Sequence, residues 1–240
     1  MNKKLKIMAV GDSITCGVKG NYSYRRYLVQ SLDSILDSFE MVGSQENTDP
    51  PTCFKSAHEA FPGWKTSDFI DPQSGKLTFE SSLLHYRPTT ILLHIGSNDL
   101  LKGKSVQSIC NNITHILDSI IEIDSSITIF VANVIPIYAK NGVERLLVRT
   151  LHRYISNIYS LGKQLAFELE SIFDEQYKQS VYMVNVRKHF NKSMLTQDFV
   201  HPNVQGDIHI SSAFFNKISE VHGLKSMVKY DSVIFHDNSM

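Results

Sequence analysis

The stretch from Ile7 to Gly17 restricts the fold of this chain more than any other part of the sequence. Residues 5–10 form a short apolar run, which predicts a buried strand that ends at Gly11. Ser13 follows two residues later, and residues 24–39 carry apolar side chains at helical spacing. A strand, a tight polar turn and a helix in this order place Ser13 at the carboxyl end of a sheet, where α/β proteins carry their sites.

The rest of the chain repeats the same alternation of strands and helices. Strands are predicted at residues 40–43, 89–96, 126–132 and 181–184, and helices at residues 77–86, 106–123, 143–173 with a break near Gly162, and 208–218. Strands separated by helices predict a parallel sheet of about five strands with helices on both faces, an α/β fold of the three-layer α/β/α, flavodoxin-like kind. We expect residues 1–240 to form a single domain, with the tail from about residue 226 unassigned.

Four further residues stand where chemistry would be expected in such a fold. Asn98 follows the strand at residues 89–96, Gly63 follows a polar, Pro-rich loop, and Asp198 and His201 lie in the loop at residues 191–206. Taken singly, Gly63 and Asn98 are typical turn formers, and Asp198 and His201 are typical of a polar surface loop. Their combination with Ser13 makes a shared site the better interpretation.

These blocks resemble those of a known enzyme family. Gly11-Asp12-Ser13, the segment around Gly63-Trp64, Gly96-Ser97-Asn98-Asp99, and Asp198 with His201 occur in the order found in the SGNH hydrolases, the GDSL-type esterases and lipases. The helix start Tyr24-Arg25-Arg26-Tyr27-Leu28 is most similar to the branch that removes acetyl groups from polysaccharides. The chain departs from the pattern at Ala60-Phe61, where relatives usually have Gly-His.

The resemblance implies a catalytic triad and an oxyanion hole. Ser13 would be the nucleophile, His201 the base, and Asp198 the group that orients His201. The oxyanion hole would consist of the Ser13 N–H, the Gly63 N–H and the Asn98 side-chain amide. Asp12 is expected to be structural, bonding nearby amides in the turn rather than serving as the triad acid.

Other chemical groups in the sequence have simpler interpretations. The three cysteines, Cys16, Cys53 and Cys110, are widely spaced and predict neither a disulfide framework nor a zinc site. Cys16 is expected to be a buried, inert thiol, because no cationic residue adjoins it in the sequence. His94 is expected to be a core histidine with its hydrogen bonds satisfied. Arg25 and Arg26 are interpreted as solvated charges on a helix surface.

Composition excludes several functional classes. The formal net charge is zero and the isoelectric point is about 7.1, which disfavours a nucleic-acid-binding protein. The spacing of His58, His85 and His115 predicts no metal site, and we expect no cofactor. No apolar segment is long enough to span a bilayer, and the basic N-terminus lacks the apolar run of a signal peptide, so we expect a cytoplasmic protein.

The leading hypothesis is a serine esterase that acts on short acyl esters, above all acetyl groups on a carbohydrate, with Tyr22 or Trp64 stacking on a sugar. A lysophospholipase or thioesterase is the alternative enzyme, although the polar loop at residues 44–61 does not suggest an apolar acyl groove. A non-catalytic carbohydrate-binding protein would normally have lost Ser13, Asp198 or His201. A flavodoxin-like nucleotide binder lacks support, because the chain has no glycine-rich phosphate loop.

Overall fold

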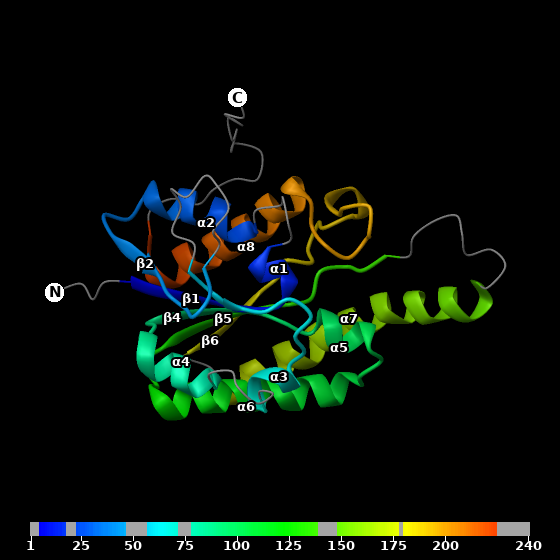
Figure 1. Cartoon of the computed structure of the whole chain (residues 1–240), viewed down its shortest axis with the longest axis horizontal. Coiled ribbons are helices and arrows are strands. Elements are labelled where there is room, and N and C mark those ends of the chain that lie inside the picture. The colour runs from blue at the N-terminus through cyan, green and yellow to red at the C-terminus, as the bar shows by residue number, and fades with distance from the viewer. Residues whose placement is uncertain are drawn as a thin grey trace.

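A parallel sheet forms the centre of the protein (Figure 1). The structure is a computed structural model. It describes residues 5–17, 23–46, 57–71, 78–138, 148–177 and 180–224, without the side chains of residues 148–157. The strands are β1 (Leu5–Gly11), β2 (Phe39–Met41), β3 (Glu59–Ala60), β4 (Thr90–His94), β5 (Thr128–Ala132) and β6 (Val181–Val184). They are arranged in the order β2-β1-β4-β5-β6, and β3 pairs with the end of β1. The strand order reverses beside β1, so the carboxyl ends of β1 and β4 flank the crevice where α/β folds bind ligands.

Helices cover both faces of the sheet, as Figure 1 shows. Their bounds are α1 (Ser13–Cys16), α2 (Tyr24–Asp33), α3 (Ser67–Ile70), α4 (Phe79–Tyr86), α5 (Ser97–Leu101), α6 (Val106–Ile123), α7 (Val148–Gln176) and α8 (Val204–His222), with a 3₁₀ turn, η1, at Lys192–Met194. α2 and α8 lie on one face, whereas α4, α6 and α7 lie on the other (Figure 1).

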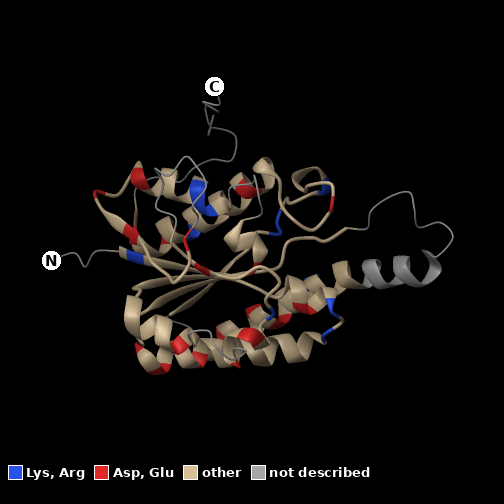
Figure 2. Ribbon diagram, in the orientation of Figure 1, with Lys and Arg blue, Asp and Glu red and all other residues tan. Residues whose placement is uncertain are grey.

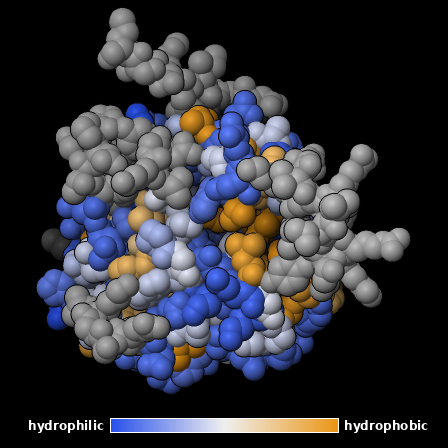
Figure 3. All heavy atoms as spheres, turned by 45° about the vertical axis from the view of Figure 1, so that its right-hand side comes forward, coloured by the Kyte–Doolittle hydropathy of each residue, from blue (hydrophilic) through white to orange (hydrophobic). Residues whose placement is uncertain are grey.

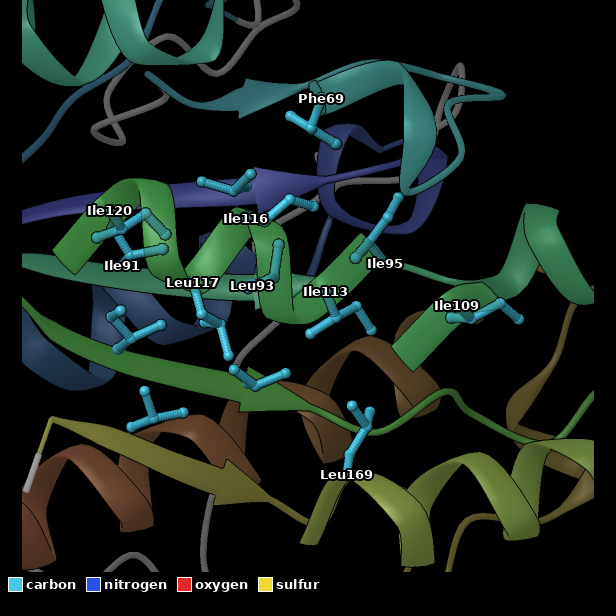
Figure 4. Close-up of a cluster of buried hydrophobic side chains, with 14 of the residues drawn as sticks. Phe69, Ile91, Leu93, Ile95, Ile109, Ile113, Ile116, Leu117, Ile120 and Leu169 are labelled. Carbon is cyan, nitrogen blue, oxygen red and sulfur yellow. The ribbon is translucent and has the colours of Figure 1, made fainter. Parts of the chain in front are cut away.

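Side chains alternate along the strands and build one hydrophobic core on each face. Met8 and Val10 of β1 face the helices α6 and α7, while Ile7 and Ala9 face α2 and α8. Figure 4 shows the larger cluster, in which α6 packs its apolar stripe against β4. Every residue of β4 is buried, as expected for a central parallel strand. The predicted three-layer α/β/α architecture is confirmed.

The predicted break near Gly162 is wrong, because α7 runs without interruption from Val148 to Gln176. Gly162 has a packing role instead. A Cβ atom at this position would lie 2.8 Å from Nη1 of Arg187, whose guanidinium packs against the helix here. Glycine at this position leaves room for the Arg187 guanidinium, although glycine weakens a helix interior. Residues 143–147, which were also predicted to be helical, lie outside the described residues.

Other elements differ from the prediction at their ends. The helix α2 stops at Asp33, and residues 39–41 already belong to β2. The loop expected at residues 44–61 contains a bridge between Gln45 and His58, followed by β3. Short pairings of this kind have no periodic signal of their own, because too few residues take part. The tail from residue 226 lies outside the described residues.

The surface of the described part carries charges of both signs. Asp and Glu are scattered over both helical layers, with Lys and Arg between them (Figure 2). None of the helices in the described ranges is both long and apolar enough to cross a membrane.

Candidate active site

Ser13 lies at the start of α1, directly after the central strand β1. Asp12 caps this helix, because its Oδ1 accepts a hydrogen bond from the Ile14 N–H at 2.9 Å. A Cβ atom on Gly11 would lie 2.4 Å from the His94 carbonyl oxygen, so only glycine fits at the end of β1 beside β4. Strand end, glycine and cap together present Ser13 at the carboxyl edge of the sheet.

Ser13, His201 and Asp198 form a continuous chain of hydrogen bonds. The Ser13 Oγ lies 2.8 Å from His201 Nε2, and His201 Nδ1 lies 2.6 Å from Asp198 Oδ2. The structure therefore brings together three residues that are up to 188 positions apart in the sequence. Each polar atom stands in the relation that proton transfer from a serine through an oriented histidine requires.

The Asp198 carboxylate is held by the turn that also carries His201. Its Oδ1 accepts from the Thr196 hydroxyl at 2.8 Å and from the backbone N–H groups of Val200 and His201 at 2.8 and 2.9 Å. Partial burial acts to raise the pKa of Asp198, but these hydrogen bonds and the one to the His201 ring outweigh it and hold the pKa well below its ordinary value. Asp198 therefore remains an anionic acceptor for His201 Nδ1.

Asn203 fixes both ends of the loop that carries Asp198 and His201. Its Oδ1 caps α8 by accepting from the N–H groups of Gln205 and Gly206, at 3.0 and 3.1 Å. Its Nδ2 donates to the Ser193 carbonyl at 2.7 Å. The sequence analysis gave Asn203 no role, although an asparagine before an apolar helical segment is a helix-start signal.

The segment of Gly63 begins beside the end of β1, the strand that precedes Ser13. The Phe61 N–H donates to the Gly11 carbonyl at 3.0 Å, and the chain then turns at Gly63, which has a φ of +81°. Gly63 is exposed, and neither its N–H nor that of Ser13 has a hydrogen-bond partner among the described residues. Both backbone donors are thus free for a ligand.

Asn98 lies in the first turn of α5, shortly after the carboxyl end of β4, where the sequence predicted an amide donor. Its Nδ2 donates to the Trp64 carbonyl at 2.9 Å and has a longer contact of 3.4 Å with Asp12 Oδ2. One amide hydrogen therefore ties α5 to the segment of Gly63. The other makes only a long contact and is therefore available to a ligand placed near it.

Asp12 is almost fully enclosed, with 1% of its surface exposed. Burial raises the pKa of Asp12 to about 7, against the opposing effects of the Ile14 N–H and His201. Asp198 and not Asp12 is bonded to His201 Nδ1, so Asp12 acts in this structure on the turn and on Asn98.

A second network supports the segment of Gly63 and escaped the sequence analysis. Thr66 donates to the buried carboxylate of Asp99 through its N–H at 3.0 Å and its hydroxyl at 2.7 Å. Asn112 of α6 donates to the same hydroxyl at 2.9 Å. These bonds anchor the residues that follow Trp64 to α5 and α6.

Arg25 corrects the expectation of a solvated surface charge, because only 1% of its surface is exposed. Its Nε donates to the Thr15 carbonyl at 2.7 Å and its Nη2 to the Cys16 carbonyl at 3.1 Å. Burial lowers the pKa of Arg25 to about 10. Its guanidinium holds the last carbonyls of the short helix that begins with Ser13.

Two further expectations need correction. Cys16 is partly exposed rather than buried, although burial of the thiol still raises its pKa and leaves it a poor nucleophile. His94 is buried as expected, but neither of its ring nitrogens has a hydrogen-bond partner among the described residues, and burial lowers its pKa to about 4. Cys53 lies outside the described residues.

Within the described ranges, no group of histidine, cysteine, aspartate or glutamate side chains has the arrangement of a metal site. Figure 3 brings the carboxyl end of the sheet forward and shows hydrophobic surface bordered by hydrophilic residues. The arrangement around Ser13 thus offers a hydroxyl, a base and several N–H donors, which are the groups needed for acyl transfer.

Comparisons with known proteins agree with this chemistry. A sequence model of the GDSL-like lipase/acylhydrolase family matches residues 9–207. Among curated proteins, no relative matches the chain. The solved structures similar to it include a family 3 carbohydrate esterase from Talaromyces cellulolyticus, with 20% identity, a TM-score of 0.73, and coverage of 92% of this chain and 99% of that one.

Two other solved structures are similar in the same way. A family 3 carbohydrate esterase from Clostridium thermocellum has 23% identity and a TM-score of 0.69, with 92% of this chain and 98% of that one covered. An acetyl esterase mutant with an acetate ion has 20% identity and a TM-score of 0.72, with 90% and 97% covered. At these identities the likeness establishes the fold.

Proposed function

The chain belongs to the GDSL-like lipase/acylhydrolase family, a family of carboxylic ester hydrolases, and on that premise we propose that it is a serine esterase that removes short acyl groups, above all acetyl groups, from a carbohydrate. The single observation that carries the proposal is the hydrogen-bonded chain from Ser13 Oγ through His201 to Asp198, with distances of 2.8 and 2.6 Å.

In the first half of the reaction, Ser13 Oγ attacks the ester carbonyl while His201 Nε2 accepts the hydroxyl proton. Asp198 keeps the other ring nitrogen protonated and stabilises the imidazolium that forms. His201 then passes the proton to the leaving alcohol oxygen as the carbon–oxygen bond breaks. The products of this half are the free alcohol and an acyl ester on Ser13.

The negative charge of the tetrahedral intermediate falls on the former carbonyl oxygen. The N–H groups of Ser13 and Gly63 and the Asn98 amide stabilise this oxyanion, and each such donor is typically worth about 100-fold or more in rate. In binding the oxyanion, the Asn98 amide exchanges only its 3.4 Å contact with Asp12, and its bond to the Trp64 carbonyl remains. In the second half, His201 activates a water molecule that hydrolyses the acyl ester.

The preference for a short acyl group rests on two kinds of support. The similar solved structures described above bear the names of acetyl and carbohydrate esterases. The residues next to the triad are also polar, since residues 191–197 include Asn191, Lys192, Ser193, Thr196 and Gln197. A lipid esterase instead gains roughly 0.8 kcal/mol for each methylene that it buries against apolar walls.

A series of p-nitrophenyl esters tests this proposal. The account predicts that kcat/KM is highest for acetate and falls through butyrate, octanoate and palmitate. A rise from acetate to octanoate would reject a short-acyl carbohydrate esterase and favour the lysophospholipase or thioesterase alternative. The Ser13→Ala variant provides the background for each ester, so that hydrolysis independent of the proposed nucleophile is subtracted.

A further inference from the structure

A depression in the surface lies at the carboxyl ends of β5 and β6, next to α7, and has a volume of about 350 Å³. We call it the α7 groove. Its walls include Tyr159, Lys163 and Phe167 from α7 and Asn185, Arg187 and Lys188 from the segment after β6. None of Ser13, Asp198 and His201 lines it, so it is distinct from the candidate active site.

The α7 groove is rich in positive charge. Lys163, Arg187 and Lys188 contribute three cations, and Glu170 is the one carboxylate in the wall. Among the described residues, no carboxylate lies within ion-pair distance of these three cations. An exposed face with several unpaired cations attracts anions and holds them more tightly when a ligand excludes water.

The central cation is fixed in place by neutral groups. Arg187 donates through Nη1 to the Val134 carbonyl at 2.9 Å and through Nη2 to the Tyr159 carbonyl at 3.0 Å. Its guanidinium also lies over the Tyr159 ring, 4.7 Å from the ring centroid, in the space that Gly162 leaves open. Its positive charge is therefore held in the wall without being neutralised.

The side-chain amide of Asn185 adds a further donor to the wall. Asn185 Oδ1 accepts from Asn133 Nδ2 and from the Lys188 N–H, both at 3.0 Å. These two bonds occupy the amide oxygen of Asn185, so the NH₂ group of the same amide is available to a ligand. A wall that offers almost only donors matches a ligand group that offers only acceptors, such as a carboxylate.

Aromatic surface adjoins these donors. The Phe167 side chain is 71% exposed, which is unusual for a residue of its size and hydrophobicity, and the Tyr159 ring lies beneath Lys163 and Arg187. The negative face of an aromatic ring attracts positively polarised C–H groups, which a sugar ring presents on one face. Hydrogen-bond donors for a carboxylate, with an aromatic ring beside them, therefore suit a sugar that carries a carboxylate group.

Tyr138 connects the α7 groove to the loop of the candidate active site. The Tyr138 ring lies 5.9 Å from that of Tyr159, and the Tyr138 N–H donates to the carbonyl of Phe199, which stands between Asp198 and His201. We propose that the α7 groove binds a carboxylate-bearing sugar unit of the acetylated chain whose ester is cleaved at Ser13. This inference rests on the proposed function, because it assumes a carbohydrate substrate.

Direct binding tests the inference without requiring turnover. Isothermal titration of the Ser13→Ala protein with trigalacturonate, which carries no ester, is compared with xylotriose as the neutral sugar of equal length. We expect trigalacturonate to bind at least about tenfold more tightly, with an affinity that falls as salt is added. Equal affinity for the two sugars would overturn the inference.

A charge variant locates the binding. Lys163→Gln combined with Lys188→Gln is expected to weaken trigalacturonate binding by about tenfold. The matched control, Lys6→Gln with Lys217→Gln, removes the same charge at the amino end of β1 and on α8. If both double variants lose affinity equally, the α7 groove is not the binding site. If inorganic phosphate binds to the α7 groove but trigalacturonate does not, the assignment to a sugar acid is wrong.

Kinetics separate this inference from the proposed function. Wild-type protein is assayed with p-nitrophenyl acetate, acetylated oligogalacturonate and acetylated xylo-oligosaccharide. We expect the acidic substrate to have the higher kcat/KM of the two sugars, and the Lys163→Gln/Lys188→Gln variant to lose that preference. Failure to hydrolyse any acetyl ester would refute the proposed function. Hydrolysis of p-nitrophenyl acetate without a preference for the acidic sugar would refute the inference alone.

Discussion

At the scale of single residues, the site depends on how His201 is held. A serine hydroxyl is a weak nucleophile, and the 2.8 Å contact with His201 Nε2 helps only while that nitrogen is an acceptor. Asp198 ensures this by accepting a hydrogen bond of 2.6 Å from Nδ1, which keeps the proton on that nitrogen. Three further donors, from Thr196, Val200 and His201, fix the second carboxylate oxygen of Asp198.

Removing His201, or the Asp198 carboxylate that orients it, should therefore abolish most of the activity. We expect His201→Ala and Asp198→Asn each to lower kcat by roughly 10⁴-fold, the first by loss of the base and the second by loss of the correct tautomer. The measurement is kcat with p-nitrophenyl acetate, with circular dichroism to show that the variants fold. His115→Ala, at an exposed position of α6, is the control. An Asp198→Asn protein of near-normal kcat would contradict the assigned role.

Asp12 should make the stability of the protein depend on pH. Its carboxyl has a pKa of 3.8 ordinarily and about 7 when buried in the folded protein. Folding therefore favours the protonated carboxyl, and this contribution to stability is complete below about pH 4 and is lost as the pH rises through about 7. The Asp12→Asn variant lacks this dependence.

The measurement is urea unfolding of both proteins at about pH 5 and about pH 8. The free energy of unfolding of Asp12→Asn should rise relative to wild type by roughly 2–3 kcal/mol between these two conditions. Comparing the two proteins removes the contributions of other titrating groups, such as His94. A difference that stays constant with pH would show that Asp12 is ionised throughout.

At the scale of elements, the short helix α1 is positioned from both of its ends. Asp12 caps its start, and the buried guanidinium of Arg25 holds the Thr15 and Cys16 carbonyls at its end. A helix of four residues has almost no stability of its own, so these side chains determine where Ser13 lies.

Replacing Arg25 should thus affect both stability and catalysis. We expect Arg25→Met to lower the free energy of unfolding by about 2 kcal/mol, because two carbonyls lose their donor, and to lower kcat by about tenfold as Ser13 shifts from His201. Thermal unfolding and kcat with p-nitrophenyl acetate measure these effects. The neighbouring Arg26→Met, at a partly exposed position, serves as the control. Equal effects of the two substitutions would refute a special role for Arg25.

The sequence predicted α6 and β4 well and the short elements poorly. Helix α6 has a clear helical apolar stripe and strand β4 is a nearly continuous apolar run, so the burial of both could be foreseen. Arg25 was expected on the surface because arginine is charged, yet its hydrogen bonds to backbone carbonyls permit burial. The network of Thr66, Asp99 and Asn112 joins residues from three elements, and no local pattern in the sequence reveals such contacts.

At the scale of the whole molecule, the sheet brings four distant segments to one edge. Residues that follow β1, β3 and β4 meet the loop before α8 there, with a hydrophobic core on each face keeping the strands in register. The resemblance of these blocks to a known family predicted that Ser13, Asp198 and His201 would meet, and the hydrogen bonds between them agree. The distances between them, and the neighbouring α7 groove, depend on packing that becomes visible only in three dimensions.

The most direct test of the account is to identify the residue that a fluorophosphonate modifies in the native protein. Peptide mapping by mass spectrometry should find the adduct on Ser13, because only this hydroxyl is activated by His201. Denatured protein and the His201→Ala variant should remain unlabelled under the same conditions. The account predicts labelling of Ser13 together with loss of p-nitrophenyl acetate hydrolysis. Labelling of another residue, or full activity after Ser13 is modified, would contradict it.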